Sequence, residues 1–344
     1  MVSLPFDGLE QSKRYTVLQL AQDGTLSPPG AVFEMGRAFD GPIRLTPDGR
    51  FGVAAQVRVG FEEDNSLGVF EVDARGSVTV VEAMFDSSFF PHSFTMSADG
   101  ETLWVLDQAF PEAGGGIYEV SLGCDGTLSE VGLAVAGRLI STLDFTSDGR
   151  VLVGAHRFDG APAEAEAFVF DWRNPAAPLG AADLFGHEDA VIQAAVVTPD
   201  DAMFVLADTS TFAPAPNRVG FGRVEDGTII AEGTIDIFNP YEMVASPFGD
   251  VLLVASGEQN AIYILDYDPL ADPAITLRGE LEYVGAPPQL PGKATRVQRG
   301  TLEGLVIWAE NTGIRRIQFG GDGVVTDLGL HDIGEITGAI GVQP

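Results

Sequence analysis

The chain has 344 residues, of which 50 are Asp or Glu and 19 are Lys or Arg, so its formal net charge is −31. Such a surface repels the phosphates of nucleic acids and anionic lipids, and we expect neither as a partner. The same repulsion opposes self-association, so we expect a monomer. No apolar run approaches the roughly 20 residues of a membrane-spanning helix. The 42 glycines and 21 prolines favour many short strands joined by turns.

The first residues, MVSLPFDGLEQ, lack the basic and apolar regions of a signal peptide. Cys124 is the only cysteine of the sequence, so the chain can form no internal disulfide. We expect a periplasmic, cell-surface or secreted bacterial protein whose signal segment is absent from this chain. The alternative is a cytoplasmic protein, which the same observations fit.

An apolar strand, a turn and a second apolar strand recur six times, at steps of about 50 residues. The copies begin at Ile43, Ser93, Thr142, Ala194, Glu242 and Ala294. The turn positions are Gly49, Gly100, Gly149, Asp201, Gly249 and Gly304. Asp-Gly occupies the first three turns, and it favours a hairpin because glycine adopts the positive φ that the turn requires.

A second kind of hairpin lies between these copies, as in GVFEVDARGSVTVVE from Gly68 and IYEVSLGCDGTLSEVGLAV from Ile117. Each period therefore holds four strands, which is the content of one β-propeller blade. The inner strands are apolar on both faces, as expected where blades stack. The outer strands alternate apolar and polar residues, as expected at a solvated rim.

The two ends of the sequence indicate how the ring closes. The segment that begins at Tyr15, YTVLQLAQDGTLSPPGAVFEM, has the pattern of an outer hairpin, and no full inner hairpin precedes it. Near the other end, the pattern of Ile336–Val342 indicates an inner strand. We predict that this strand completes the N-terminal blade, which removes exposed sheet edges. The prediction is a single all-β domain over residues 1–344, a seven-bladed β-propeller whose closing blade is shared by the N- and C-terminal segments. Six blades are the alternative, if the N-terminal hairpin packs elsewhere.

Four segments, LTPDGRFGVAAQ, PHSFTMSADGETLWVLD, LDFTSDGRVLVGA and YEMVASPFGDVLLVASGEQNAIYIL, resemble the lactonase-type seven-bladed propellers, which include 6-phosphogluconolactonase-like and YVTN-repeat proteins. The resemblance covers nearly the whole chain. It implies a central-channel site of His, Glu and Arg, to which His92 and Glu242 correspond. The chain departs from the family at two basic positions. Leu139-Ile140-Ser141-Thr142 replaces an Arg-His pair, and Ser256-Gly257 replaces an Asn-Arg pair.

In propellers, the loops between blades and those between second and third strands gather on one face, where ligands bind. The first strands bring to this face Arg44, His92, Thr142, Gln193, Glu242 and Arg296. The second strands end at Gln56, Asp107, His156, Asp208, Ser256 and Glu310. The long loops add Arg157, Phe61, Phe110, Phe158 and Phe212. We therefore predict an acidic, Phe-bearing ligand face over the channel, unless each Phe packs onto its own blade.

Two groups of these residues suit specific chemistry. His92 with Asp107 suits a general base and its orienting carboxylate, and the alternative is a histidine that holds a junction between blades. Four carboxylates offer oxygen ligands to Ca²⁺ or another divalent cation; they belong to Asp107, Asp208, Glu242 and Glu310. The alternative is that strand ends are polar because they reach solvent. Nothing in the sequence requires a cofactor.

Three functions remain open on these residues. The first, which we expect, is a binding propeller that holds a protein, peptide, sugar or cation on the acidic face, because both basic family positions are replaced and the loops are long. The second is a lactonase-like hydrolase, with or without a divalent metal, in which His92, Glu242 and Arg296 are catalytic. The third is an acidic scaffold without a ligand.

Overall fold

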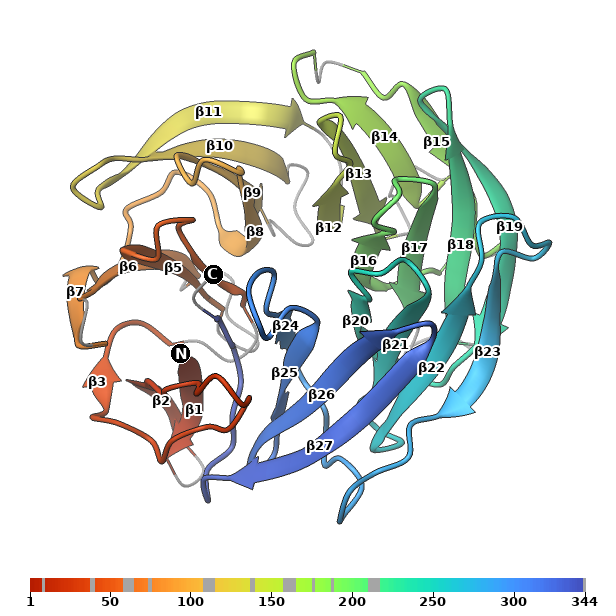
Figure 1. The fold of residues 1–344 in the computed structure, drawn as a ribbon. Coiled ribbons are helices and arrows are strands. Elements are labelled where there is room, and N and C mark those ends of the chain that lie inside the picture. Colours follow the sequence, from red (N-terminus) through yellow and green to blue (C-terminus); the bar gives the residue numbers. More distant parts are fainter. Residues whose placement is uncertain are drawn as a thin grey trace.

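The computed structural model describes residues 1–7, 10–37, 41–57, 65–73, 76–107, 115–136, 140–156, 165–174, 177–186, 189–209 and 217–342. These residues form strands and turns, and within them no helix is long and apolar enough to cross a membrane. The strands make seven antiparallel sheets that stand in a ring (Figure 1). The predicted all-β, seven-bladed propeller is confirmed, and the six-bladed alternative is wrong.

Blades 1 to 3 each contain four strands that follow one another outward from the centre of the ring. Blade 1 contains β4 (Ile43–Leu45), β5 (Phe51–Gln56), β6 (Ser66–Val72) and β7 (Val78–Glu82). Blade 2 contains β8 (Pro91–Met96), β9 (Thr102–Asp107), β10 (Gly116–Leu122) and β11 (Leu128–Ala136). Blade 3 contains β12 (Ile140–Phe145), β13 (Arg150–Ala155), β14 (Ala167–Asp171) and β15 (Gly180–Ala182).

Blades 4 to 6 repeat the same order. Blade 4 contains β16 (Ile192–Val197), β17 (Met203–Asp208), β18 (Arg218–Glu225) and β19 (Thr228–Asp236). Blade 5 contains β20 (Pro240–Ala245), β21 (Val251–Ser256), β22 (Ala261–Tyr267) and β23 (Ile275–Glu280). Blade 6 contains β24 (Ala294–Arg296), β25 (Leu305–Glu310), β26 (Gly313–Gly321) and β27 (Val324–Asp332).

Short polar turns close the inner hairpins, as the sequence predicts. In the first turn, the hydroxyl of Thr46 donates to Asp48 (2.6 Å), the amide of Gly49 donates to the Thr46 carbonyl (2.7 Å), and Gly49 has a φ of 69°. The sixth turn is longer than the others, because β24 ends at Arg296 and β25 begins at Leu305. This extra length changes how the residues of blade 6 align with those of the other blades.

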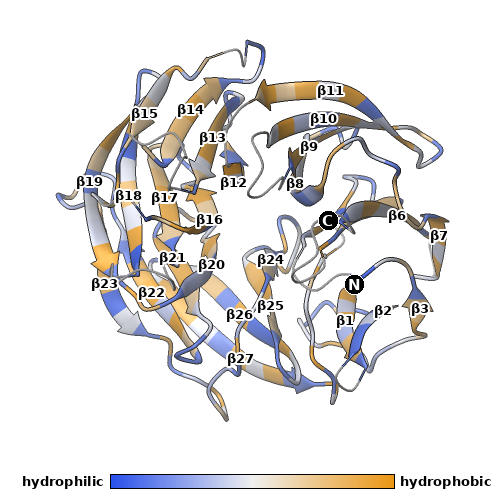
Figure 2. Cartoon of the chain, turned by 180° about the vertical axis from the view of Figure 1, so that it is seen from behind, coloured by the Kyte–Doolittle hydropathy of each residue, from blue (hydrophilic) through white to orange (hydrophobic). Residues whose placement is uncertain are grey.

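Apolar packing between neighbouring blades forms the core. The cluster between blades 1 and 2, for example, contains Val53, Leu67, Leu103 and Val105, all fully buried. The described residues form seven such clusters, one for each interface of a closed seven-bladed ring. Figure 2 shows the apolar residues concentrated in the inner strands and polar residues more frequent toward the rim.

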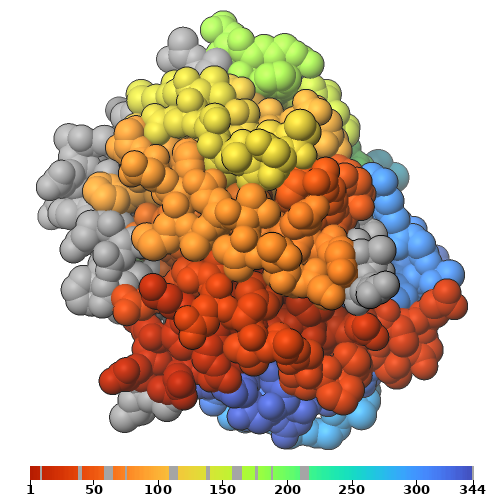
Figure 3. All heavy atoms as spheres, turned by 90° about the vertical axis from the view of Figure 1, so that its left-hand side faces the viewer, coloured from red at the N-terminus to blue at the C-terminus, as the bar shows by residue number. Residues whose placement is uncertain are grey.

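The closing blade combines both ends of the described chain. It contains β1 (Val2–Asp7), β2 (Glu10–Thr16) and β3 (Phe33–Glu34), and the C-terminal segment pairs with β1 through Val2 and Ile340. The amide of Ser3 donates to the carbonyl of Ala339 at 2.9 Å. Figure 3 shows the N-terminal residues between blade 1 and the C-terminal part of the chain. The predicted sharing of this blade is confirmed, and β1 is a strand that the sequence prediction did not contain.

Candidate functional site in the central channel

A cavity of about 610 Å³ runs along the central channel. The first strands of blades 1 to 6 and the C-terminal segment form its wall, and its volume lies within the range of small-molecule sites. All six residues that the sequence places on the first strands line this cavity. They are Arg44, His92, Thr142, Gln193, Glu242 and Arg296.

A β-bulge at the start of the first strand turns polar side chains toward this cavity. In blades 2 to 5, the pairing of first and second strands shifts by one residue, and the extra residues are His92, Ser141, Gln193 and Tyr241. Such bulges redirect a side chain and are frequent next to functional sites. Three of the four line the cavity: His92, Ser141 and Gln193.

Backbone pairing places Glu242 and Lys293 at equivalent positions on neighbouring blades. Glu242 pairs with Ala255, the penultimate residue of β21, and the carbonyl of Lys293 accepts from the amide of Ala309, the penultimate residue of β25 (2.9 Å). The side chains meet as an ion pair, with 3.0 Å between Lys293 Nζ and Glu242 Oε2. They are 21% and 17% exposed, respectively, so the pair is open to the channel and largely shielded from bulk solvent.

Arg296, the predicted catalytic arginine, lies deeper in the channel and bonds to the neighbouring blade. Its Nη1 donates to the carbonyl of Ala245 on blade 5. Asp144 acts similarly from blade 3, because its carboxylate accepts from the amide of Val197 on blade 4 at 2.8 Å. Burial lowers the pKa of Arg296 and raises the pKa of Asp144. Both side chains satisfy backbone groups at an inner strand edge, so both hold neighbouring blades together.

Arg44 extends from blade 1 into the same cavity. Burial within the ring lowers its pKa, and the charges of Glu242 and Asp144 act in the opposite direction. An arginine remains protonated under either influence. Within the described part of the chain, no hydrogen bond or ion pair holds its guanidinium, and the side chain is open to the channel. Arg44 is therefore a cation that can bind a ligand.

The second strands end in buried residues that hold the linkers between blades. Asp107 is 7% exposed and accepts from the amide of Phe90 at 3.0 Å, and Asp208 is fully buried and accepts from the amide of Val191 at 2.9 Å. Ser256, which is also buried, donates to the carbonyl of Phe238 in the linker between blades 4 and 5. These side chains therefore lie behind the channel wall and do not form the open ligand face that we predicted for them.

Gln56 and Glu310 follow the same pattern, with exposures of 2% and 1%. Gln56 donates to the carbonyl of Ala83, and Glu310 accepts from the amide of Gln289 at 3.2 Å. The role of these strand ends explains why the sequence keeps polar residues there: each satisfies a backbone group of a linker that would otherwise be buried without a partner.

The four predicted metal ligands are not brought together. Glu242 lines the cavity, whereas the other three are buried in blades 2, 4 and 6; those three are Asp107, Asp208 and Glu310. Among the described residues, no three His, Cys, Asp or Glu side chains form a group that could hold a metal ion. The proposed cation site therefore has no geometric support in this part of the chain.

His156 directly follows β13, and the charge of His92 acts on its imidazole. Burial, with a smaller contribution from the charge of His92, lowers the pKa of His156 to about 4. The Nδ1 atom of His156 accepts from the amide of Ile192 at 3.1 Å, so His156 joins blade 3 to blade 4.

The predicted loop residues Phe61, Phe110, Arg157, Phe158 and Phe212 lie outside the described residues.

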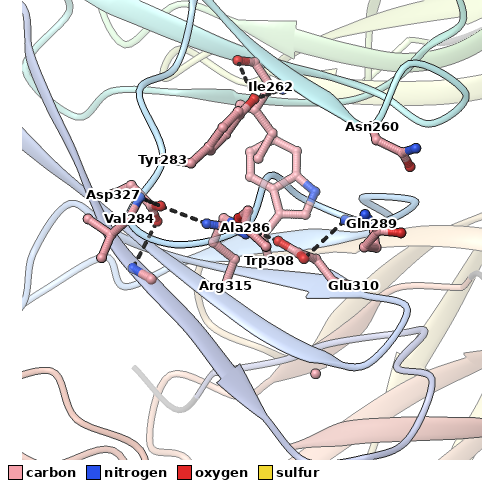
Figure 4. Close-up of polar contacts among 12 residues, drawn as sticks. Asn260, Ile262, Tyr283, Val284, Ala286, Gln289, Trp308, Glu310, Arg315 and Asp327 are labelled. Carbon is pink, nitrogen blue, oxygen red and sulfur yellow. Dashed lines mark hydrogen bonds and ion pairs between the residues drawn. The ribbon is translucent and has the colours of Figure 1, made fainter.

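A buried charged triad fixes the linker that leads to Lys293. Arg315 lies between Glu310 and Asp327, with 2.6 Å between Arg315 Nη1 and Asp327 Oδ2, and all three side chains are fully buried (Figure 4). Burial raises the pKa of Glu310, and Arg315 acts in the opposite direction. The guanidinium also donates to the carbonyl of Ala286 in the linker (2.8 Å).

The triad and a tryptophan bind the linker at further points. Asp327 accepts from the amide of Val284 at 2.7 Å, and the indole of Trp308 donates to the carbonyl of Gly292 at 2.8 Å. Gly292 directly precedes Lys293. The backbone that leads to Lys293 is therefore held at Val284, Ala286 and Gly292, which positions the start of the Lys293 side chain on the blade next to Glu242.

The sequence prediction missed Lys293 because it aligned the sixth copy on the wrong glycine. Counting back from Gly304 places Arg296 at the start of blade 6. The structure shows the longer turn, in which Gly300 has a φ of 87°, and Lys293 lies seven residues before Gly300 just as Glu242 lies seven before Gly249. A constant spacing between the first strand and its turn is the signal that could have found Lys293.

Comparison with known proteins agrees with the architecture. A family profile described as "Lactonase, 7-bladed beta-propeller" matches residues 9–110. The structure is similar to the periplasmic gluconolactonase PpgL of Pseudomonas aeruginosa, with 15% identity, a TM-score of 0.71 and coverage of 98% of this chain and 96% of that one. It is also similar to a putative 6-phosphogluconolactonase of Bacteroides uniformis, with 15% identity, a TM-score of 0.70 and the same coverage.

A third similar structure is a putative 6-phosphogluconolactonase of Bacteroides fragilis, with 14% identity, a TM-score of 0.69 and coverage of 98% and 94%. No curated protein matches the sequence. The chain is thus a seven-bladed propeller that resembles the lactonase type, as the hairpin sequences indicate.

Proposed function

We propose that this protein is a lactonase-like hydrolase whose reaction takes place in the central channel. The observation that carries the proposal is the ion pair between Glu242 and Lys293, 3.0 Å apart on neighbouring blades of a cavity that His92 and Arg44 also line. The partial match to the lactonase family and the similar lactonase structures support the same class of reaction.

The proposed site contains the groups that lactone hydrolysis needs. The carboxylate of Glu242 takes a proton from water as the water oxygen bonds to the lactone carbonyl carbon. The ammonium group of Lys293 keeps Glu242 ionised and stabilises the negative charge that develops on the carbonyl oxygen. The ring C–O bond then breaks as the ring oxygen takes a proton from protonated His92, and proton exchange with water returns Glu242 to the carboxylate and His92 to the imidazolium. The product is a hydroxy acid.

The hydrolase replaces the binding propeller as our preferred function. One reason to expect a binding propeller is that the chain lacks the basic residues of two family positions. The channel nevertheless contains two cations at other positions, Arg44 and Lys293, so this reason no longer argues against a hydrolase. The other reason to expect a binding propeller is the set of long Phe-bearing loops, and these loops lie largely outside the described residues.

The experiment is a screen of five- and six-membered lactones with the wild type and the variant Glu242→Gln, with and without a chelator. We expect turnover above the spontaneous rate and a loss of at least about a hundredfold in kcat for the variant. The matched control is Glu71→Gln, which removes an exposed carboxylate paired with Arg50 outside the channel. No lactone hydrolysed above background, or equal rates for both variants, would reject the proposal.

A further inference from the structure

A second cavity, of about 620 Å³, lies among the closing blade, blade 1 and blade 6. It adjoins the channel cavity where the first strands end, since Leu45 and Val297 line both. Its volume also lies within the range of small-molecule sites. None of the residues that we place in the hydrolase reaction, His92, Glu242 and Lys293, lines this second cavity.

Two departures from the regular repeat build this cavity. One is the longer sixth turn, residues 297–304, and the other is the loop of residues 17–32 between β2 and β3. This loop folds back on itself through a β-bridge of its own, and Arg316 of β26 ties it to blade 6 by donating to the carbonyl of Gly24 at 2.9 Å. Leucines of the two segments line the cavity; they are Leu18, Leu20, Leu26 and Leu302.

The side chains that line the cavity are divided into an apolar floor and a polar mouth. Every apolar side chain of the lining is buried or half-buried, and Val2, Ile307 and Ile314 are among the buried ones. All the polar side chains of the lining are exposed; they are Gln19, Gln22, Arg299 and Thr301. An apolar cavity favours an apolar group, which leaves water when it enters. The lining therefore suits a ligand with an apolar tail and a polar head.

Arg299 determines the charge of that head. It is the only charged side chain among the described residues that line the cavity, and within the described part of the chain no hydrogen bond or ion pair holds its guanidinium. In a chain with 50 acidic residues, exposed arginines readily find a carboxylate, as Arg50 finds Glu71. Asp23, on the same loop, instead accepts from the hydroxyl of Thr25 at 2.7 Å. A planar carboxylate head matches a single guanidinium through two parallel hydrogen bonds.

We propose that this cavity binds a medium-chain fatty acid in its free, ionised form. The aliphatic tail lies between the loop of residues 17–32 and the sixth turn, and the carboxylate meets Arg299 at the mouth. The acid comes from solution and not from a bilayer, because the net charge of −31 repels anionic membrane surfaces. The site goes beyond the proposed function and does not depend on it.

The test is a chain-length series of hexanoate, octanoate and decanoate. Binding to the full-length protein is measured by isothermal titration calorimetry at neutral pH and constant ionic strength. We expect one site, with an affinity that rises roughly fourfold for each added methylene group that the cavity buries. Octyl phosphate and 1-octanol carry the same tail with a different head, and we expect both to bind more weakly than octanoate.

One pair of variants tests the carboxylate contact. Arg299→Gln should lower the affinity for octanoate by about fivefold, as expected for an exposed charge pair, and should leave the affinity for 1-octanol unchanged. The control is Arg173→Gln, which removes an equal charge from an exposed site on blade 3, where the guanidinium lies over the ring of Trp172. The control should bind both ligands as the wild type does.

A second pair of variants tests the location of the tail. Leu302→Trp places a larger side chain in the cavity and should abolish the binding of octanoate and of 1-octanol. The matched control is Leu270→Trp, at a site that is 95% exposed in blade 5 and outside the cavity. Far-UV circular dichroism verifies that each variant is folded. If Leu302→Trp does not fold, Leu26→Phe fills the cavity from the opposite wall.

Several outcomes would overturn the inference. They are no saturable binding of any of the three acids, an affinity that does not rise with chain length, and an affinity for octanoate that survives Arg299→Gln or the filled cavity. A loss of binding in Arg44→Gln would place the acid in the channel instead. Tighter binding of octyl phosphate would identify a phosphate site, and Arg299-dependent sedimentation with phosphatidylcholine vesicles would identify a bilayer contact. Binding that depends on Arg299 in a protein that hydrolyses no lactone would support this inference and reject only the hydrolase.

Discussion

At the scale of single residues, His156 shows how the fold depends on protonation. Its Nδ1 must be unprotonated to accept the hydrogen bond from Ile192, and burial lowers its pKa to about 4. In the unfolded chain the pKa is near 6.5, so the unfolded state binds this proton first as the pH falls. The stability that His156 contributes is complete above about pH 6.5 and is lost progressively as the pH falls toward 4.

We predict that His156→Asn reduces the acid sensitivity of the fold. Asparagine keeps an acceptor near the position of Nδ1 and does not titrate. One pKa unit corresponds to about 1.4 kcal/mol, so the wild type should lose on the order of 2 kcal/mol more than the variant between pH 7 and pH 4.5. Urea unfolding of both proteins at the two pH values measures this difference. Equal losses would show that His156 is not the titrating group.

Residue types in the sequence indicate which side chains surround the channel but not what each one does there. Arg44 and Arg296 both lie on first strands and both line the cavity. Arg296 meets a carbonyl of blade 5, whereas Arg44 meets no hydrogen-bonding partner among the described residues. This difference depends on contacts between blades far apart in the sequence, and a pattern within one repeat contains no information about them.

At the scale of elements, the linker between blades 5 and 6 is fixed by charges in a dry environment. The side chains of Glu310, Arg315 and Asp327 are fully buried, and they hold the backbone of the linker before Lys293. Removing three charges from water is costly unless each is fully hydrogen-bonded, so the triad depends on every member. It fixes the position of a site residue more than it adds stability.

We predict that Arg315→Met destabilises the protein by about 3–5 kcal/mol, because two buried carboxylates lose their counter-ion. Arg218→Met is the control. It breaks the pair with Asp236, in which the two side chains are 30% and 81% exposed, and should cost about 1 kcal/mol or less. Guanidinium chloride unfolding at pH 7 gives both values. Similar losses in the two variants would mean that the buried triad contributes no more than a surface pair.

The repeat could be predicted from the sequence because its signals are local. An Asp-Gly turn between two apolar runs needs only neighbouring residues, and the alternation of inner and outer hairpins follows from strand patterns. The sixth blade was misaligned because its turn is longer, which moved Arg296 into the place that Lys293 occupies. The triad was not predictable either, since Arg315 and Asp327 lie on strands whose sequence pattern predicts an outer hairpin at the solvent-exposed rim.

At the scale of the whole molecule, ring closure depends on a few residues at the C-terminal end. Thr337 bonds to blade 6 through the carbonyls of Glu310 (2.9 Å) and Gly313 (2.7 Å). Two residues further on, Ala339 bonds to Ser3 of the closing blade. The segment therefore joins the last complete blade to the closing blade. The shared closing blade could be predicted from the sequence because an inner strand without a partner at the end of the chain must pair with another strand.

We predict that Ile340→Ala destabilises the whole ring by about 2–5 kcal/mol, because Ile340 is 3% exposed and packs with Val2 and Ile307 between the closing blade and blade 6. The control is Ile336→Ala, four residues earlier and 37% exposed, for which a markedly smaller loss is expected. If the ring unfolds as a unit, circular dichroism and tryptophan fluorescence should report the same lowered midpoint, although the tryptophans lie in blades 2, 3 and 6. Separate transitions, or equal effects of the two variants, would show that the closing blade unfolds independently and does not hold the ring together.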